Sequence, residues 1–191
     1  MADFSGIHSR NGAMRVTPSE DLLTDKGSGP NRRLRVDVGQ TGFFAGREFR
    51  TFVDLSLAIG ASLVIKAVVP VNIILFGLNV TVLTGQIRVE TSTGGTEGGV
   101  FSTALPIFPR NTMTERPTPY YTPLVALTSG GTITGGTLLD VTAGLTDKAV
   151  AVGAEPGDER GIGPGTYYIK LTAVGVPLVG IVKARWEERV P

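Results

Sequence analysis

The chain has 191 residues, among them 26 glycines and 12 prolines, and 41% of its residues are hydrophobic, which fits one domain with many turns around an apolar core. Its 18 lysines and arginines nearly balance 17 aspartates and glutamates, which argues against a dedicated nucleic-acid-binding protein and, through weak repulsion between copies, favours self-association. The absence of cysteine excludes disulfides, thiolate metal sites and cysteine nucleophiles.

Residues 1–33 are interpreted as an extended N-terminal arm. They are rich in Gly, Pro, Asn and Ser and follow neither the strand nor the helix period, apart from a possible helical turn at Pro18–Asp25. Such an arm must be held by its own body or by a neighbouring subunit, and we favour the neighbour. Five arginines in or just after the arm are candidates for ion pairs with a partner: Arg10, Arg15, Arg32, Arg33 and Arg35. The arm begins without the basic and apolar segments of a signal peptide, so we expect the chain to be made in a cytoplasm.

Residues 34–191 are predicted to form a single β-sandwich domain. The alternation in 48–57 places Phe49, Thr51, Val53, Leu55 and Leu57 on one face, as in a half-buried strand. A tight turn at Gly60 precedes a return strand at 63–69, and 72–80 is apolar enough for a strand buried on both faces. The apolar stretch 63–83 contains Lys66, Pro70 and Asn72, so it predicts successive buried strands and no membrane helix.

Residues 91–136 are predicted to be a long Gly/Pro-rich connection, with short strands at 123–128 and, directly after it, at 137–142. Inside it lies Thr114-Glu-Arg-Pro-Thr-Pro-Tyr-Tyr-Thr-Pro123, whose three prolines remove backbone donors and favour extended geometry. We interpret this stretch as a stiff brace. Arg116 can anchor it, and Tyr120 and Tyr121 can pin it to its own sheet or to a neighbouring subunit, which makes all three interface candidates.

The C-terminal part is predicted to be an antiparallel hairpin of strands near 165–173 and 179–189, with Trp186 on the apolar face beside Val182 and Ala184. No amphipathic helix longer than a short turn is expected. Roughly eight to ten strands with Gly/Pro turns indicate an all-β antiparallel sandwich. We favour a jelly roll, with an immunoglobulin-like sandwich as the alternative.

Catalytic patterns are weak. His8, the only histidine, lies in the arm, so a Ser-His-Asp triad is not expected. Neither a zinc pattern, a calcium loop nor a phosphate-binding loop is present, and no metal or cofactor is expected. Ten carboxylates could form a glycosidase pair: Asp54, Glu90, Glu97, Glu115, Asp140, Glu155, Asp158, Glu159, Glu187 and Glu188. Asp54 and Glu90 are interpreted as solvated strand faces, and Glu155, Asp158 and Glu159 as a surface loop beside Arg160. We expect no enzyme activity.

Aromatic residues offer one alternative, a carbohydrate-binding surface. Its platform would use Tyr120, Tyr121, Tyr167, Tyr168 and Trp186. Tyr167 and Tyr168 are neighbours in one predicted strand and point to opposite faces, so one of them is expected in the core. Trp186 continues an apolar face, and the core interpretation is favoured for it as well.

Two groups of residues resemble a known family. One is Gly42-Phe-Phe-Ala-Gly-Arg-Glu-Phe-Arg-Thr-Phe52, and the other joins Glu115–Pro123, Gly165-Thr-Tyr-Tyr-Ile169 and Trp186-Glu-Glu-Arg189 with a final Pro191. Together they resemble small proteins encoded among the virion genes of tailed bacteriophages, over residues 36–191. The resemblance implies an accessory virion component, either a capsid decoration (cement) protein or a small tail protein. It implies no catalytic residue, and it leaves the arm as the part that adapts each protein to its own particle.

We therefore expect a non-enzymatic virion structural protein, first of all a capsid decoration protein that forms homotrimers on the head shell. Its partners would be itself and a major capsid protein or another virion protein, without nucleic acid or membrane. The alternatives are a tail, adaptor or fibre-base protein, a carbohydrate-binding module of the host-recognition apparatus, and a host-cell globular protein with an unknown ligand.

Overall fold

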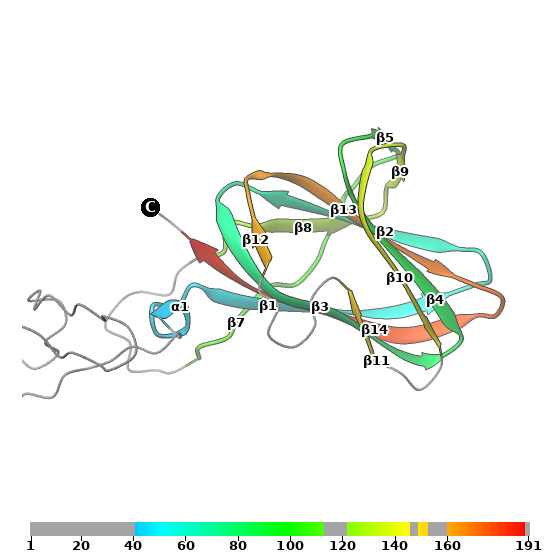
Figure 1. Cartoon of the computed structure of the whole chain (residues 1–191), viewed down its shortest axis with the longest axis horizontal. Helices are drawn as coiled ribbons and strands as arrows, with labels where there is room; N and C mark the ends of the chain where they lie inside the picture. Colours follow the sequence, from blue (N-terminus) through cyan, green and yellow to red (C-terminus); the bar gives the residue numbers. More distant parts are fainter. Residues whose placement is uncertain (1–40, 113–121, 146–148, 153–159, 190–191) are drawn as a thin grey trace, which may run out of the picture. The chain divides into compact units, whose positions relative to one another are not determined.

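A computed structural model describes residues 41–112, 122–145, 149–152 and 160–189 of the chain (Figure 1). The region from Gly42 onward forms a compact unit of its own. The predicted arm, residues 1–33, lies outside the described residues.

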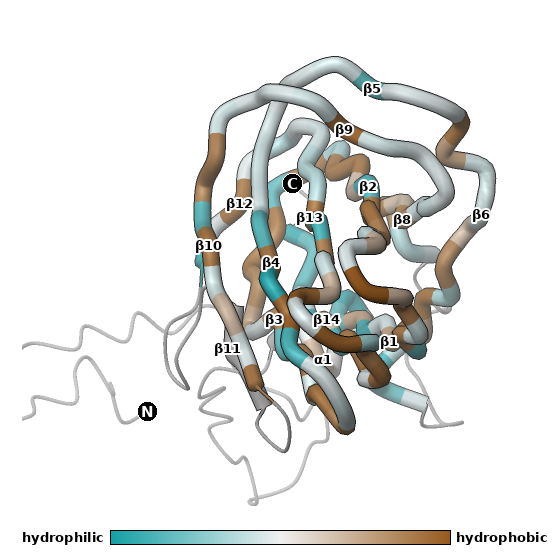
Figure 2. Tube along the Cα trace, turned by 90° about the vertical axis from the view of Figure 1, so that its right-hand side faces the viewer, coloured by the Kyte–Doolittle hydropathy of each residue, from teal (hydrophilic) through white to brown (hydrophobic). Residues whose placement is uncertain are grey.

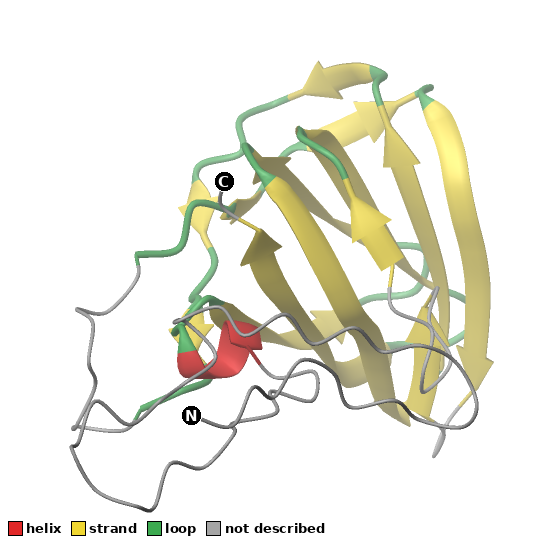
Figure 3. Cartoon of the chain, turned by 60° about the vertical axis from the view of Figure 1, so that its left-hand side comes forward, coloured by secondary structure: helices red, strands yellow, loops and turns green. Residues whose placement is uncertain are grey.

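The described residues form one helical turn and fourteen strands, coloured by type in Figure 3. In chain order these are α1 (Thr41–Phe44), β1 (Glu48–Leu57), β2 (Ser62–Val69), β3 (Asn72–Thr84), β4 (Gln86–Thr93), β5 (Thr96–Gly98), β6 (Thr103–Ala104), β7 (Phe108–Pro109), β8 (Ala126–Ser129), β9 (Thr132–Thr134), β10 (Thr137–Leu145), β11 (Ala149–Val152), β12 (Arg160–Ile162), β13 (Gly165–Ala173) and β14 (Leu178–Arg189). Within these residues no helix has the length and apolarity that a membrane span requires.

Two antiparallel sheets pack face to face, so the predicted all-β antiparallel sandwich is confirmed. The β1 sheet has the order β11-β3-β14-β1-β7, with β12 also paired to β3, and the β2 sheet has the order β10-β4-β13-β2-β8-β6. In the described part of the chain, β5 and β9 form a separate two-stranded ribbon.

The last two long strands lie in different sheets, which corrects the predicted C-terminal hairpin. β13 pairs with β2 and β4, whereas β14 pairs with β1 and β3. The turn at Gly60 likewise carries the chain from the β1 sheet to the β2 sheet, and the Gly60 amide donates to the carbonyl of Ala173 in a neighbouring turn (3.0 Å). Alternation in the sequence tells which face of a strand is apolar, but a hairpin and a crossing between sheets bury that face equally well.

Eight strands of the two sheets pair in a nested pattern. β4 pairs with β10, β3 with β11, β2 with β13 and β1 with β14, all antiparallel. The first strand therefore lies beside the last one, with Phe49 opposite Trp186. In the sequence, the two strands of each inner pair lie between the two strands of the pair outside it.

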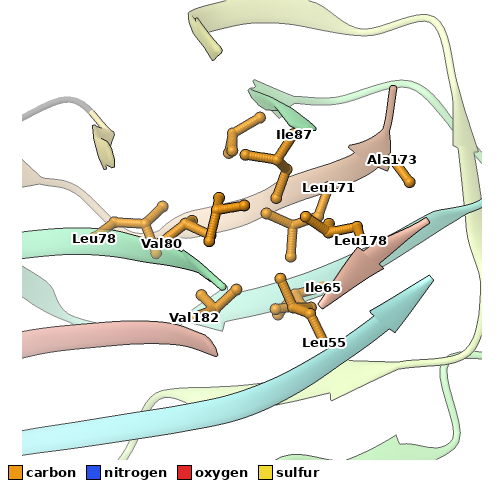
Figure 4. Close-up of a cluster of buried hydrophobic side chains, with 11 residues drawn as sticks. Leu55, Ile65, Leu78, Val80, Ile87, Leu171, Ala173, Leu178 and Val182 are labelled. Carbon is orange, nitrogen blue, oxygen red and sulfur yellow. The ribbon is translucent and has the colours of Figure 1, made fainter. Parts of the chain in front are cut away.

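The core lies between the sheets in two clusters. One contains Leu55, Val80 and Val182 of the β1 sheet and Ile65 and Leu171 of the β2 sheet, which point toward one another in Figure 4. The other is built around two aromatic side chains, Phe49 and Trp186, whose ring centroids are 6.1 Å apart. Trp186 is 2% exposed, so its predicted place in the core is confirmed.

The prediction that 72–80 is buried on both faces is wrong for the second half of that stretch. Val80 and Val82 face the core, whereas Asn79 and Leu83 are exposed. The described chain leaves this part of the outer surface of β3 uncovered.

Four glycines explain the arrangement of the β5–β9 ribbon. The β4–β10 pair ends near Thr93 and Thr137, and the ribbon begins just beyond it with Thr96 opposite Thr134. Between them lie Gly94-Gly95 and Gly135-Gly136, all with positive φ angles. A Cβ on Gly136 would lie 2.7 Å from the carbonyl oxygen of Gly94. Only glycine fits this bend, which turns the ribbon away from the strands that lead into it. Figure 2 shows the ribbon as an arch at the top.

A buried carboxylate fixes the segment that follows the predicted brace. Glu188 of β14 is 0% exposed and accepts hydrogen bonds from the backbone amides of Leu124 and Val125 (3.0 Å each). The indole N–H of Trp186 also lies within 3.4 Å of its Oε1. A buried carboxylate requires such hydrogen-bond donors, so Glu188 of β14 fixes the position of Leu124 and Val125, directly after the predicted brace.

Candidate interaction surface

The outer surface of the β1 sheet carries the candidate site. Along β1 the inner residues Phe49, Thr51 and Leu55 are buried, and the residues between them face outward. With their neighbours on β7, β14 and β3 they form what we name the β1/β14 face. Its members are Arg50, Phe52, Asp54, Phe76, Phe108, Lys183 and Arg185.

Two arginines oppose each other in the centre of this face. Arg50 of β1 lies directly opposite Arg185 of β14, and Lys183 lies opposite the next outward residue, Phe52. All three cations are exposed, and none of them forms a salt bridge with any described residue. Asp54 is the carboxylate that shares the face. Like charges directly opposite on neighbouring strands destabilise a sheet, so this arrangement has a cost in the isolated chain.

Exposed aromatic rings surround these cations. Phe52 and Phe108 stack with 5.2 Å between ring centroids and an interplanar angle of 8°, although they are 45% and 38% exposed. The guanidinium of Arg185 lies over the ring of Phe76, 4.6 Å from its centroid. A stacked pair left in water combines apolar area with a flat, fixed shape, and the cation–π contact holds Arg185 in a set position.

At one end of the β1/β14 face, a pair of acidic residues is neutralised. Glu48 lies opposite Glu187 in the same two strands, and both are buried. Arg110 forms a salt bridge with Glu48, and Arg189 lies 3.1 Å from the carboxylate of Glu187. The chain thus supplies partners for its opposed glutamates but none, among the described residues, for its opposed arginines.

The outer surface of the β2 sheet is different, because the β5–β9 ribbon covers part of it. Glu97 of β5 accepts a hydrogen bond from the hydroxyl of Tyr168 on β13 (2.5 Å) and pairs with Lys66 on β2 (2.6 Å). The hydrogen bond from Lys66, followed by that from Tyr168, lowers the pKa of the Glu97 carboxyl. Burial, followed by the hydrogen bond to Glu97, raises the pKa of Tyr168 to about 12.

The uncovered part of the same surface is charge-paired. Arg88 lies 2.8 Å and Lys170 lies 4.0 Å from the carboxylate of Glu90. This confirms the interpretation of Glu90 as part of a polar strand face. The outer surface of the β2 sheet therefore neutralises its own charges, and the β1/β14 face does not.

The structure does not describe the interface residues that the sequence predicts. Arg10, Arg15, Arg32, Arg33, Arg35, Arg116, Tyr120 and Tyr121 all lie outside the described residues. Of the other aromatic residues proposed for a carbohydrate surface, Tyr168 and Trp186 are buried, and Tyr167 is half-buried and donates to the carbonyl of Gly163 (3.0 Å). No exposed platform forms from these three. Among the described residues, no group of three or more potential metal ligands gathers.

The sequence contains one signal for the β1/β14 face that the alternation alone does not explain. Phe52 stands on the polar face of its strand, between Arg50 and Asp54. A large aromatic residue out of phase with the core is the kind of residue that marks an interface. Its partner Phe108 comes from a separate short strand, and only the fold brings the two together.

Comparisons of the chain with protein-family models, with curated proteins and with solved structures found no match.

Proposed function

We propose that this protein is a non-enzymatic structural component of a phage virion, a capsid decoration protein that binds the head shell as a homotrimer. The observation that carries the proposal is the β1/β14 face, where the opposed Arg50 and Arg185 lack a carboxylate partner in the described chain and lie beside the exposed Phe52–Phe108 stack. An acidic surface of the major capsid protein would supply the missing anions and cover the rings.

The composition of the face favours a protein partner. Interface cores are enriched in aromatic residues and arginine, and the residues that dominate binding are often of these types. The flat guanidinium of arginine pairs with carboxylates through two parallel hydrogen bonds, and it keeps its charge when water is excluded. Two arginines side by side thus fit a pair of carboxylates on the partner.

The proposal includes a jelly-roll topology for the sandwich. Nested antiparallel pairing of the first strand with the last, through to the two middle strands, is what results when one long hairpin is wound into two Greek keys. The pairs β1–β14, β2–β13, β3–β11 and β4–β10 follow this scheme. Viral capsid domains are among the proteins that use this architecture, although a fold alone does not assign a function.

The proposal also assigns a role to residues 1–33, which we propose to be an extended arm that reaches a neighbouring subunit and strengthens attachment. Deletion of residues 1–33 is expected to leave a soluble, folded body with weaker attachment to the particle. Unchanged attachment after the deletion would show that the arm does not contribute to binding, and the β1/β14 face would remain as the proposed binding surface.

Copy number in purified virions tests the location. A decoration protein repeats with the symmetry of the shell and is expected in numbers on the order of hundreds per particle, measured by quantitative mass spectrometry. A count on the order of ten would place the protein in the tail or at a vertex instead. Electron cryomicroscopy of the same particles gives the position and shows whether the copies form trimers.

Charge reversal tests the surface. We expect Arg50→Glu combined with Arg185→Glu to weaken binding to shells stripped of the protein by tenfold or more, since like charges juxtaposed across an interface cost several kcal/mol. Arg88→Glu on the exposed outer surface of the β2 sheet is the matched control for the single variant Arg50→Glu, because both change the net charge by the same amount, and it should bind like the wild type. An equal loss of shell affinity in test and control variants would show that net charge alone causes the effect. Tighter binding of the wild type to single-stranded DNA than to shells would assign the face to nucleic acid.

A further inference from the structure

The space between the sheets contains a cavity of about 490 Å³. It opens on the side where β10 of the β2 sheet and β12 of the β1 sheet lie, and it reaches inward to Trp186. A volume of this size is within the range of small-molecule sites in proteins, which are concave, mostly apolar and largely preformed.

Residues that point into the sandwich show that this space is accessible. Val53 and Ala184 of the β1 sheet and Ile169 of the β2 sheet occupy inner positions of their strands, yet each is only half-buried. In a closed sandwich these positions would be fully packed, at the density typical of protein interiors. The chain therefore maintains a lined apolar space in the middle of its core.

Among the described residues, the opening of this cavity is polar and carries no net charge. Arg160 of β12 and Asp140 of β10 face each other across it at 3.5 Å, with side chains 49% and 23% exposed. An exposed pair at this distance contributes little to stability and can separate easily. Each charge has its opposite beside it, so a ligand with a net charge would gain one attraction and meet one repulsion at the opening.

We propose that this cavity binds an uncharged aliphatic molecule, with the chain inside the sandwich and a terminal hydroxyl at the Arg160–Asp140 opening. The walls offer apolar area to the chain, and the ion pair offers both a donor and an acceptor to the hydroxyl. This site uses none of the side chains of the β1/β14 face, so it stands or falls independently of the proposed role in the shell.

Straight-chain alcohols provide the direct test on the full chain. A neutral fluorescent probe, N-phenyl-1-naphthylamine, should bind at one saturable site and be displaced by the alcohols. Affinity should rise about fourfold for each added CH₂, which corresponds to ~0.8 kcal/mol per buried CH₂, and should stop rising once the chain fills the cavity. Tighter binding of the alkyl carboxylate or the alkyl ammonium of equal length would overturn the neutral site.

A filled cavity supplies the control for location. Ala184→Phe places a ring into the half-buried wall position, and it should reduce probe affinity at least tenfold. Ala126→Phe adds the same ring at an exposed position of β8 and should leave affinity unchanged. Val53→Phe fills the cavity from β1 and serves as the second variant if Ala184→Phe does not fold. Unchanged binding in a folded cavity variant, or no saturable binding by the wild type, would overturn the proposal.

Discussion

Both outer surfaces of the sandwich carry aromatic and charged side chains, but the chain covers and neutralises them on one surface and not on the other. On the β2 sheet, the β5–β9 ribbon folds over Tyr168, and Lys66 and Glu97 neutralise each other beside it. On the β1 sheet, Phe52 and Arg50 remain exposed, with no carboxylate bound to the arginine in the described residues. The chain covers an aromatic residue on one surface and leaves a stacked pair exposed on the other, and this difference is the reason we propose the β1/β14 face as a binding surface.

The largest expected effect comes from removing one aromatic ring on each surface. Tyr168→Ala should lower the free energy of unfolding by about 3–5 kcal/mol, the range for a buried aromatic residue, because Tyr168 is only 4% exposed. Phe52→Ala should lower it by about 1 kcal/mol or less, because its ring is already half in water. Urea denaturation of both variants measures the contrast, and equal losses would mean that the β1/β14 face is part of the core.

The glycines at the base of the β5–β9 ribbon offer a second test of how this ribbon covers the β2 sheet. Gly136→Ala should cost about 1–3 kcal/mol, the range for a residue forced into strained backbone, because its φ angle is +93° and the new Cβ would meet the Gly94 carbonyl oxygen. Gly161→Ala is the matched control, since nothing lies within 4 Å of its Cβ position and its φ angle is not in the left-handed region. Thermal unfolding distinguishes them, and equal midpoints would show that the bend tolerates a side chain.

The covered surface should also respond to pH. Because the pKa of Tyr168 is raised to about 12 in the folded chain, the neutral hydroxyl stabilises the fold below the ordinary tyrosine pKa of about 10. This contribution is lost as pH rises toward the folded value. Tyr168→Phe should therefore lose less stability than the wild type over this alkaline range, as measured by urea midpoints.

The acid side of the same contact has the opposite sign. The pKa of Glu97 is lowered by the hydrogen bonds from Lys66 and Tyr168. Its contribution is present above the ordinary glutamate pKa and is lost as pH falls through the folded value. The free energy of unfolding of Glu97→Gln should depend less on pH in the acid range than that of the wild type. Parallel curves for the two proteins would show that the Lys66–Glu97 ion pair does not contribute to stability.

The smallest expected effect is a gain. Arg50→Glu replaces an arginine pair by an opposite-charge pair with Arg185, and it should stabilise the isolated protein by about 0.2–1 kcal/mol, while it weakens shell binding. Arg50→Gln should gain less, because it removes the repulsion without adding an attraction. A loss of stability in Arg50→Glu would show that the two arginines are not in conflict in the free protein.

Local strand structure was predictable from the sequence, and the pairing of strands was not. The alternation of Phe49, Thr51 and Leu55 predicted the buried face of β1 correctly, because one residue pattern determines one strand face. The same pattern led to a hairpin of β13 and β14, which is wrong, because strand partners depend on contacts far away in the sequence. Phe49 meets Trp186 only through the nested topology.

The candidate surface was predictable only in part. Phe52 was visible as an aromatic residue on a polar strand face, but its significance required Phe108 and Arg185 from distant segments. The glycines of the predicted connection indicated turns, and their geometric role appears only in the structure, where Gly94 and Gly136 meet. The cavity had no sequence signal at all, because Ala184 and Ile169 look like ordinary core residues.

The nested order of the strands has a consequence for biosynthesis. The β1/β14 face joins the first of the eight nested strands to the last, and β14 also supplies Glu188, which holds Leu124 and Val125. During translation β1 must wait for its partner until nearly all of the sandwich has left the ribosome. A nascent or truncated chain therefore cannot present the paired arginines. If the β1/β14 face docks onto the shell as we propose, only chains whose synthesis has reached the end of the sandwich can bind there, and incomplete copies are excluded from the particle.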